Sequence, residues 1–487
     1  MSVNDFLSNF NEILPLTFLF SWACLLLLVD LFISESKKGI TALLAAAGLS
    51  VTLVLLIVNW DQTGAAFGGM IVVDTFSTYL NILLAVSGLL AIAVAYDYLK
   101  RTGLERGEYY TLLLFSIGGM MLMTLAADLI LIFLAFELLS IPLYVLAGFA
   151  VPRAESEEAA IKYFLLGAFS SAIMVYGIAL VYGATSTTAL SEIIAAILSG
   201  STNLGLLGIG AGLILIGLGF KVAAVPFHMW TPDVYQGAPT SVTAFMAVGA
   251  KVAGFAALVR IWIWTFSNQA LADDLTPILW GIAVLTMIGG NVIALMQHNI
   301  KRLLAYSSIA HAGYILMALV PYAQGNVTDA VVSSILFYLL AYMVTSFAAW
   351  AVVIALEQKE GKGLELDDYS GLSRKYPVLA LTMAVAMLSF IGIPPTLGFI
   401  GKFGLFSVVI DGGYIVLALI GVLTSLVSAY YYLRVVVVMY MREGEPIVRK
   451  ENLLYLTVIL TGVSMVLLGI FSEPLINWAS QAVLGMF

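Results

Sequence analysis

The sequence predicts an all-α protein that crosses a membrane many times. Of its 487 residues, 62% are hydrophobic and only 10% are charged, against a usual charged fraction of about 25%. Many uncharged runs reach the roughly 18–20 residues that a helix needs to cross a bilayer. Most Lys and Arg residues lie in alternate loops between these runs. Together these observations favour a polytopic membrane protein with fourteen transmembrane helices.

Fourteen hydrophobic segments are long enough to span the membrane. They cover residues 14–33, 40–58, 76–98, 110–126, 128–149, 162–182, 204–227, 240–264, 275–296, 303–321, 330–356, 377–410, 414–441 and 453–472. As one helix, the twelfth segment would extend about 50 Å, beyond a hydrocarbon core of about 30 Å. Pro394 and Pro395 remove backbone donors within it, so we expect a broken helix there. The seventh segment also breaks, close to Pro226.

The charged loops test this count independently. The loops after odd-numbered segments carry Lys37, Lys38, Lys100, Arg101, Arg106, Arg153, Lys162, Lys301, Arg302, Lys359, Lys362, Arg374, Lys375, Arg442, Arg449 and Lys450. The loops after even-numbered segments and both tails carry no Lys or Arg. Because basic loops stay on the cytoplasmic side, we expect a multi-pass protein of a bacterial inner (plasma) membrane. Both termini should face its outer, periplasmic side.

Composition excludes several classes of function. A net charge of −8, spread along the chain, does not suit a nucleic-acid binder. The single cysteine, Cys24, rules out an internal disulfide, an iron–sulfur site held by thiolates or a CxxC redox pair. His298 and His311 would lie about 20 Å apart along one helix, which argues against a haem with two histidine ligands. We find no nucleotide loop, metal-ligand cluster or Ser/His/Asp constellation, and expect no cofactor in this chain.

The two broken segments suggest internal repetition. The seventh and twelfth segments lie five segments apart and each carries one lysine. Broken helices at matching places in two halves are typical of inverted repeats with polar sites near mid-membrane. We therefore expect a three-helix segment (1–109), a first five-helix repeat (110–264), a second, inverted repeat (275–441) and a C-terminal helix (442–487).

Ionisable residues inside the hydrophobic segments are the candidate functional groups. Lys221 and Lys251 lie well inside their segments, and an ammonium at that depth costs a few kcal/mol even on a lenient insertion scale. Glu137 lies about nine residues, or 14 Å, into its own segment. Two interpretations remain open. Glu137 and Lys221 form a structural ion pair, or Glu137 sets whether Lys221 keeps its proton.

Further candidates follow from position. Lys402 comes after the double proline, where freed backbone carbonyls can stabilise its charge. His228 begins the turn after the seventh segment, His311 is flanked by hydroxyl side chains, and Lys162 follows several glutamates at a helix start. Each of these last three is either a proton relay or an ordinary structural residue. Arg260 and Arg434 lie inside segments but near an end, and we expect their side chains to extend to the membrane surface.

Several stretches closely resemble a known family. GFKVAAVPFHMWTPDVYQGAPTSVTAFMAVGAKVAGF, AFELLSIPLYVLAGF, EEAAIKYFLLGAFSSAIMVYGIALVYGATSTT and NIKRLLAYSSIAHAGY are similar to the antiporter-like membrane subunits of respiratory complex I (NADH-quinone oxidoreductase). The motif TPDVYQGAPT, together with lysine at position 251, is most like the N (subunit 2) type of these subunits. The resemblance covers nearly the whole chain and is weakest in the first hundred residues.

The resemblance implies fourteen helices with two inverted repeats, and proton translocation driven by electron transfer from NADH to quinone in other subunits. By this resemblance Glu137 and Lys221 match an ion pair, Lys162 and Lys251 connecting lysines, His228 a loop histidine, and Lys402 the lysine of the second broken helix. The first repeat would form a proton half-channel. NADH, FMN, iron–sulfur clusters and quinone are expected in partner subunits of the membrane and hydrophilic arms, with no redox chemistry in this chain.

Two rival functions remain at this point. One is a subunit of a multi-subunit cation/proton antiporter, which shares the fold and would exchange sodium for protons without NADH or quinone. The other is a scaffold in which the buried charges only lock helices together. The TPDVYQGAP motif argues against the antiporter.

Overall fold

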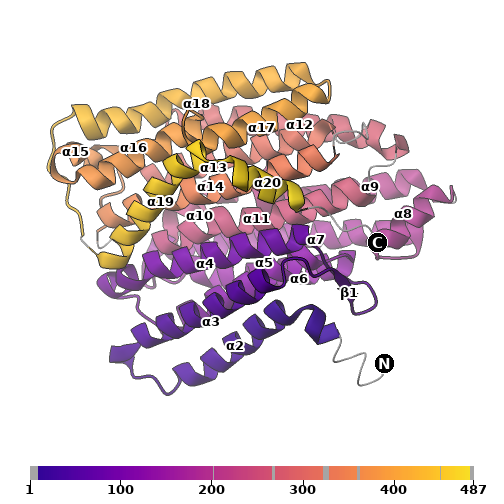
Figure 1. Ribbon diagram of the computed structural model, residues 1–487, viewed down its shortest axis with the longest axis horizontal. Coiled ribbons are helices and arrows are strands. Elements are labelled where there is room, and N and C mark those ends of the chain that lie inside the picture. The colour runs from indigo at the N-terminus through magenta and orange to yellow at the C-terminus, as the bar shows by residue number, and fades with distance from the viewer. Residues whose placement is uncertain are drawn as a thin grey trace.

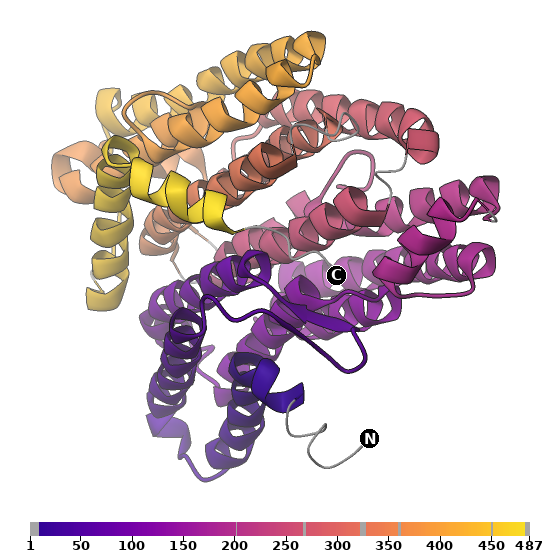
Figure 2. The same ribbon diagram turned by 45° about the vertical axis from the view of Figure 1, so that its right-hand side comes forward.

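The computed structural model describes residues 9–200, 202–265, 269–321, 328–358, 362–449 and 451–482. It is an all-α membrane protein whose helices run roughly side by side (Figure 1 and Figure 2). Within the described residues, eleven helices are long and apolar enough to cross a membrane. They are α3 (Gly39–Val58), α4 (Thr75–Thr102), α5 (Gly107–Leu125), α6 (Leu129–Ala147), α7 (Ala154–Thr185), α9 (Leu204–Val222), α11 (Thr240–Thr265), α12 (Gln269–Ala294), α14 (Thr328–Leu356), α18 (Ile415–Met441) and α19 (Asn452–Ile470).

Shorter or more polar elements complete the fold. Four further helices coincide with predicted hydrophobic segments: α2 (Leu14–Asp30), α13 (Ile300–Leu319), α16 (Pro377–Ile391) and α17 (Leu397–Asp411). The remaining elements connect or flank the spans: η1 (Glu35–Lys37), the antiparallel pair β1 (Gly64–Ala66) and β2 (Ile71–Val73), α8 (Leu190–Leu198), α10 (Trp230–Gly237), η4 (Leu366–Tyr369), α15 (Leu372–Lys375) and α20 (Glu473–Gln481). Sequence analysis did not predict these short elements, since they lack a spanning length of apolar residues.

Both expected breaks are present. Helix α9 ends at Val222, and Ala223 adopts the left-handed conformation with φ of 62°. The twelfth segment divides into α16 and α17, with Pro394 and Pro395 between them. Gly392 ends α16 with φ of 90°, a conformation that glycine adopts without the strain that a side chain would bring.

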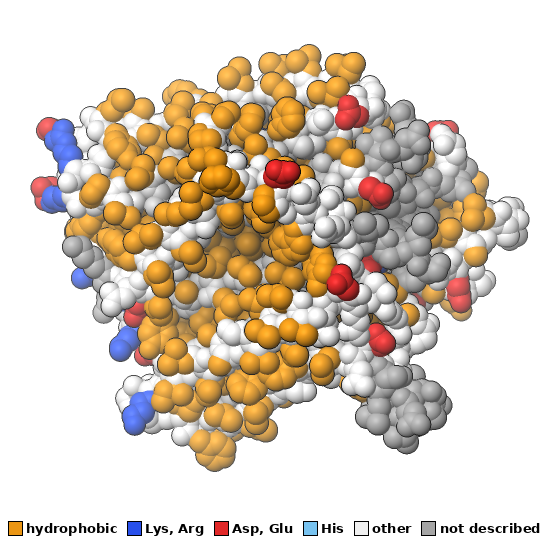
Figure 3. Space-filling model, in the orientation of Figure 1, with side chains coloured by type: hydrophobic (Ala, Val, Ile, Leu, Met, Phe, Trp, Pro, Cys, Tyr) orange, Lys and Arg blue, Asp and Glu red, His pale blue; other side chains and the backbone are white. Residues whose placement is uncertain are grey.

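Two helices form the centre of the molecule. The spanning parts of α11 and α14 are completely buried, whereas α3, α7, α12 and α19 bury less than half of theirs. The N-terminal helices α2 and α3 lie at one edge and α18 at the opposite edge (Figure 1). The face shown in Figure 3 is largely apolar, and in this view Lys and Arg gather at the end that carries α15. Of the predicted basic residues, Lys359 and Lys450 lie outside the described residues.

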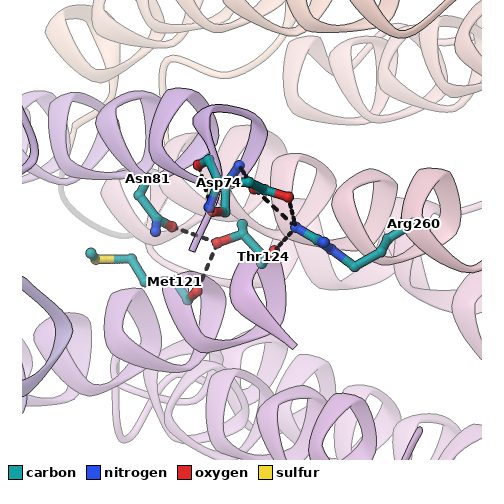
Figure 4. Close-up of polar contacts among 6 residues, drawn as sticks. Asp74, Asn81, Met121, Thr124 and Arg260 are labelled. Carbon is teal, nitrogen blue, oxygen red and sulfur yellow. Dashed lines mark hydrogen bonds and ion pairs between the residues drawn. The ribbon is translucent and has the colours of Figure 1, made fainter. Parts of the chain in front are cut away.

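A buried ion pair joins three helices toward the end of the molecule that lies away from α15. Asp74 caps α4 by accepting a hydrogen bond from the Ser77 backbone at 2.8 Å. Arg260 of α11 donates to both oxygens of Asp74, at 3.2 and 3.1 Å, and to the backbone oxygen of Thr124 in α5 at 3.0 Å (Figure 4). Both charged side chains are 1% exposed. The expectation that Arg260 reaches the membrane surface is therefore wrong, because Asp74 gives it a carboxylate inside the protein.

We predict that Arg260→Met lowers the stability of the protein strongly. Removing one partner leaves the other charge buried and uncompensated, at a cost of about 3–5 kcal/mol. Thermal unfolding of the purified protein in detergent measures this, with Arg442→Met at an exposed ion pair as the control. The double variant Asp74→Asn/Arg260→Met should recover much of the loss. Equal effects of Arg260→Met and Arg442→Met would contradict the assignment.

Candidate functional site

The side chains of Glu137 and Lys221 meet hydroxyl groups rather than each other. Lys221, 1% exposed near the end of α9, donates to Ser140 Oγ at 2.8 Å and to the Tyr163 hydroxyl at 3.3 Å. Half-buried Glu137 accepts a hydrogen bond from Ser171 of α7. Among the described residues, no ion pair within 4 Å includes Glu137 or Lys221. Ser140, which accepts the hydrogen bond from Lys221, lies one turn along α6 from Glu137.

Lys251 lies on α11 close to Lys221. The side-chain stem of Lys221 lies 3.7 Å from the position that a side chain at Gly254 would occupy, and Gly254 is one turn from Lys251. Lys251 is 3% exposed. Its ammonium donates to the backbone oxygen of Ser308 in α13 and lies 5.5 Å from the ring centre of Tyr342.

His311 lies between Lys251 and Lys402. It interacts electrostatically with both lysines, and its ring nitrogens bond to the hydroxyls of Tyr338 and Tyr432, the latter at 3.1 Å. These contacts come from three separate helices, α13, α14 and α18. The histidine ring also lies 5.4 Å from the ring of Tyr342, which Lys251 contacts, and 5.8 Å from the ring of Tyr314, which Lys402 contacts.

Lys402 bonds to a backbone carbonyl at the second helix break. Its ammonium donates to the carbonyl of Ile391, the last residue of α16, at 3.0 Å and to Ser425 Oγ at 2.7 Å. It also lies 4.6 Å from the ring centre of Tyr314. The side chain is 4% exposed. A helix C-terminus carries partial negative charge, so this carbonyl supports an ammonium without a carboxylate.

A second polar group lies at the basic end of the molecule. Asp233 in α10 holds two cations, Lys162 of α7 at 2.6 Å and Arg302 of α13 at 2.7 Å. Lys162 also pairs with Glu158 at 2.7 Å. Burial raises the pKa of Asp233, but hydrogen bonds from Lys162 and Arg302 outweigh it and hold the pKa below its ordinary value of 3.8. A cavity of about 380 Å³ opens beside Asp233 and Arg302.

His228 stands apart from the other candidates. It is half-buried in the turn after α9, and burial lowers its pKa, against a hydrogen bond to the Pro226 backbone that raises it. No side-chain contact with another candidate is present among the described residues, and its Nδ1 is buried without a partner there. Trp230 connects this turn to α9, because its ring nitrogen donates to the Phe220 carbonyl at 2.9 Å.

Sequence analysis missed most partners of the buried charges. They are Ser140, Tyr163, Ser171, Asp233, Arg302, Tyr338, Tyr342, Ser425 and Tyr432. Only Ser140 had a usable signal, because residues three apart share a helix face and Ser140 follows Glu137 at that spacing. No group of three or more metal-binding side chains occurs in the described part of the chain. The arrangement suits movement of protons between lysines, hydroxyls and an imidazole.

Comparison with known proteins places this arrangement in context. The family described as NADH:quinone oxidoreductase/Mrp antiporter, TM, matches residues 126–428. The chain is 45% identical over 480 residues to NADH-quinone oxidoreductase subunit N of Trichlorobacter lovleyi, covering 98% of this chain and 97% of that protein. It is similar to a chain of respiratory complex I from Thermus thermophilus with bound aureothin, with TM-score 0.82, 35% identity and coverage of 96% and 99%. A chain of the Mrp complex from Dietzia sp. shares the fold, with TM-score 0.83, 20% identity and coverage of 96% and 97%.

We predict that Asp233→Asn lowers stability in a pH-dependent way. The pKa of Asp233 in the folded protein lies below its ordinary value of 3.8. The ionised carboxylate therefore stabilises the folded protein fully at pH values above 3.8, and this stabilisation is lost as the pH falls through the folded-state pKa. Each of these partly exposed pairs contributes about 0.2–1 kcal/mol. Chemical unfolding at neutral and acidic pH measures the difference between the wild type and the variant, which should shrink in acid. Asp367→Asn, at an exposed pair, is the control. A difference that grows in acid would contradict this assignment.

Proposed function

We propose a proton route for this chain, which belongs to the N-subunit family of NADH-quinone oxidoreductase (respiratory complex I), the proton-translocating membrane subunits. One observation carries the route. Lys221, Lys251, His311 and Lys402 are buried, and each contacts at least one hydroxyl or carbonyl oxygen. Such groups can pass a proton through short hydrogen-bonded steps.

In this proposal the chain crosses the membrane fourteen times. The spans are the eleven long apolar helices, together with α2, α13, and α16 with α17 as one broken span. The segments 110–264 and 275–441 form two inverted repeats, flanked by 1–109 and 442–487. Both broken helices end beside a buried lysine: Lys221 lies in the last turn of α9, and Lys402 bonds to the last carbonyl of α16. The basic loops face the cytoplasm and both termini face the periplasm.

Protons reach Lys221 from the cytoplasm near Lys162 and His228. The cavity beside Asp233 and Arg302 supplies the water. In this proposal Lys221 takes up a proton while Glu137 shifts away. The absence of an ion pair within 4 Å between the two among the described residues, with Lys221 bonded to Ser140 instead, supports such a separated state. When Glu137 returns, the balance between burial and the carboxylate changes the proton affinity of Lys221. Protons then pass through Lys251 and His311 to Lys402 and the periplasm.

Electron transfer happens in other subunits. The chain has no cluster of metal-binding side chains within its described residues and a single cysteine. In this proposal NADH, FMN, iron–sulfur clusters and quinone belong to partner subunits. The apolar outer faces of α3, α7, α12 and α18 contact lipid and neighbouring membrane-arm subunits in a bacterial inner membrane.

We predict that Lys221→Ala leaves the complex assembled but lowers the number of protons moved per electron. The buried ammonium is the group that is loaded, and alanine cannot hold the proton. Proton uptake into inverted membrane vesicles, divided by NADH oxidation, measures this ratio. Lys375→Ala, at an exposed surface pair, serves as the control. An unchanged ratio in the Lys221 variant would reject the route.

The pair Glu137 and Lys221 also separates transport from a scaffold role. We predict that Glu137→Gln and Lys221→Ala each reduce pumping and that the double variant reduces it little further, because both act on one loading step. Their effects on unfolding temperature should be small, since the two charges are not in direct contact. Strong coupling in stability with normal pumping would instead support a scaffold.

A further inference from the structure

A buried carboxylate lies where several helices end at the basic side of the molecule. Glu357 follows directly after α14 and is only 2% exposed. Helix α4 ends beside it, because Arg101 donates to the Ile354 carbonyl at 2.8 Å. The Tyr98 hydroxyl interacts with Glu357 and accepts a hydrogen bond from the Thr240 backbone, at the start of α11, at 3.2 Å.

The polar atoms around Glu357 are incompletely paired. Within the described residues, Glu357 Oε2, Thr240 Oγ1 and the Tyr369 hydroxyl are buried and have no hydrogen-bond partner. Buried polar groups in proteins are almost always hydrogen-bonded, to protein or to ordered water. Several such atoms converging on one place form the polar surroundings in which buried water is found.

Lys301 supplies the opposite charge. It is 0% exposed and interacts electrostatically with Glu357, yet no ion pair within 4 Å joins them among the described residues. Its ammonium has three donors, of which the structure assigns one, to the Ala238 carbonyl at 2.7 Å. The remaining donors and the free Glu357 oxygen can therefore share water between them.

The same helix face leads from Lys301 to Lys251. Ser308 follows Lys301 by seven residues on α13, two turns or about 10 Å further along one face. The carbonyl of Ser308 accepts the hydrogen bond from Lys251, and its hydroxyl accepts one from Tyr342 at 3.0 Å. Tyr235 of α10 also interacts with Ser308, so a second tyrosine hydroxyl lies beside Ser308.

We infer that Glu357 and Lys301 form a buried, hydrated site that takes up protons from the cytoplasmic side and passes them to Lys251 without involving Lys221. The inference rests on the proposed function of the chain. In this step the Glu357 carboxylate accepts a proton from water and releases it toward Ser308 and Lys251, so only O–H and N–H bonds form and break. Lys301 keeps its charge and stabilises the carboxylate. The titratable or charged groups around Glu357 among the described residues include Lys301, Tyr98, Tyr369 and Arg101.

Glu357→Gln tests this inference, because glutamine keeps the size and hydrogen bonding of the side chain but cannot carry the proton. In inverted vesicles holding the intact complex, we expect fewer protons moved per NADH oxidised. The matched control is Glu443→Gln, at an exposed position on the same side. Redox-induced infrared difference spectra of the wild type should show a carboxyl C=O stretching band that is lost in Glu357→Gln, which a purely structural role would not produce.

Lys221→Ala, measured in parallel, distinguishes the possible failures. A normal proton ratio in Glu357→Gln with a lowered ratio in Lys221→Ala would overturn this inference and leave the proposed function standing. Normal ratios in both would reject the proposed function. If Glu357→Gln does not assemble, a map of the wild-type complex at a resolution that shows water decides. Water bonded to both Glu357 and Lys301 is expected, and a dry contact would overturn the inference.

Discussion

The cost of placing an ammonium group inside a membrane protein governs this structure. A buried charge is tolerated only when other groups replace the water that it loses. Lys221, Lys251 and Lys402 are each at most 4% exposed, and no carboxylate lies within 4 Å of any of them among the described residues. Each ammonium instead contacts a hydroxyl or carbonyl oxygen and the face of an aromatic ring. These partners stabilise the charge, but they do not fix it as a carboxylate in direct contact would.

The contrast with Arg260 makes this point. Arg260 pairs directly with Asp74 and holds three helices together, which suits a permanent charge. The lysines lack such a partner, and a hydroxyl that accepts from an ammonium can also donate to a neutral amine. The fold places two of them where helices end: Lys221 lies in the last turn of α9, and Lys402 bonds to the last carbonyl of α16. In both places the partial negative charge of a helix C-terminus favours a cation.

Much of the fold could be predicted from the sequence, because membrane spans are set by local composition. Every predicted hydrophobic segment contains a helix, and the break at Pro394 and Pro395 lies where two missing donors require it. The positions of the buried lysines also followed from sequence. Their partners did not, since Tyr163 beside Lys221 and Tyr342 beside Lys251 come from helices far away in the chain and are recognisable only after packing. Glu357 was missed for another reason: it reads as the first polar residue of a loop, whereas four helix ends and η4 bury it.

The central claim is that buried lysines of this chain change protonation state during turnover. Nitrogen-15 NMR of lysine side chains in the assembled complex tests it directly, because ammonium and neutral amine give separate resonances. Lys221, Lys251 and Lys402 can be assigned by single substitutions. Our account predicts that at least one of the three changes between the two forms when NADH is supplied. If all three remain ammonium in both conditions, the account is contradicted.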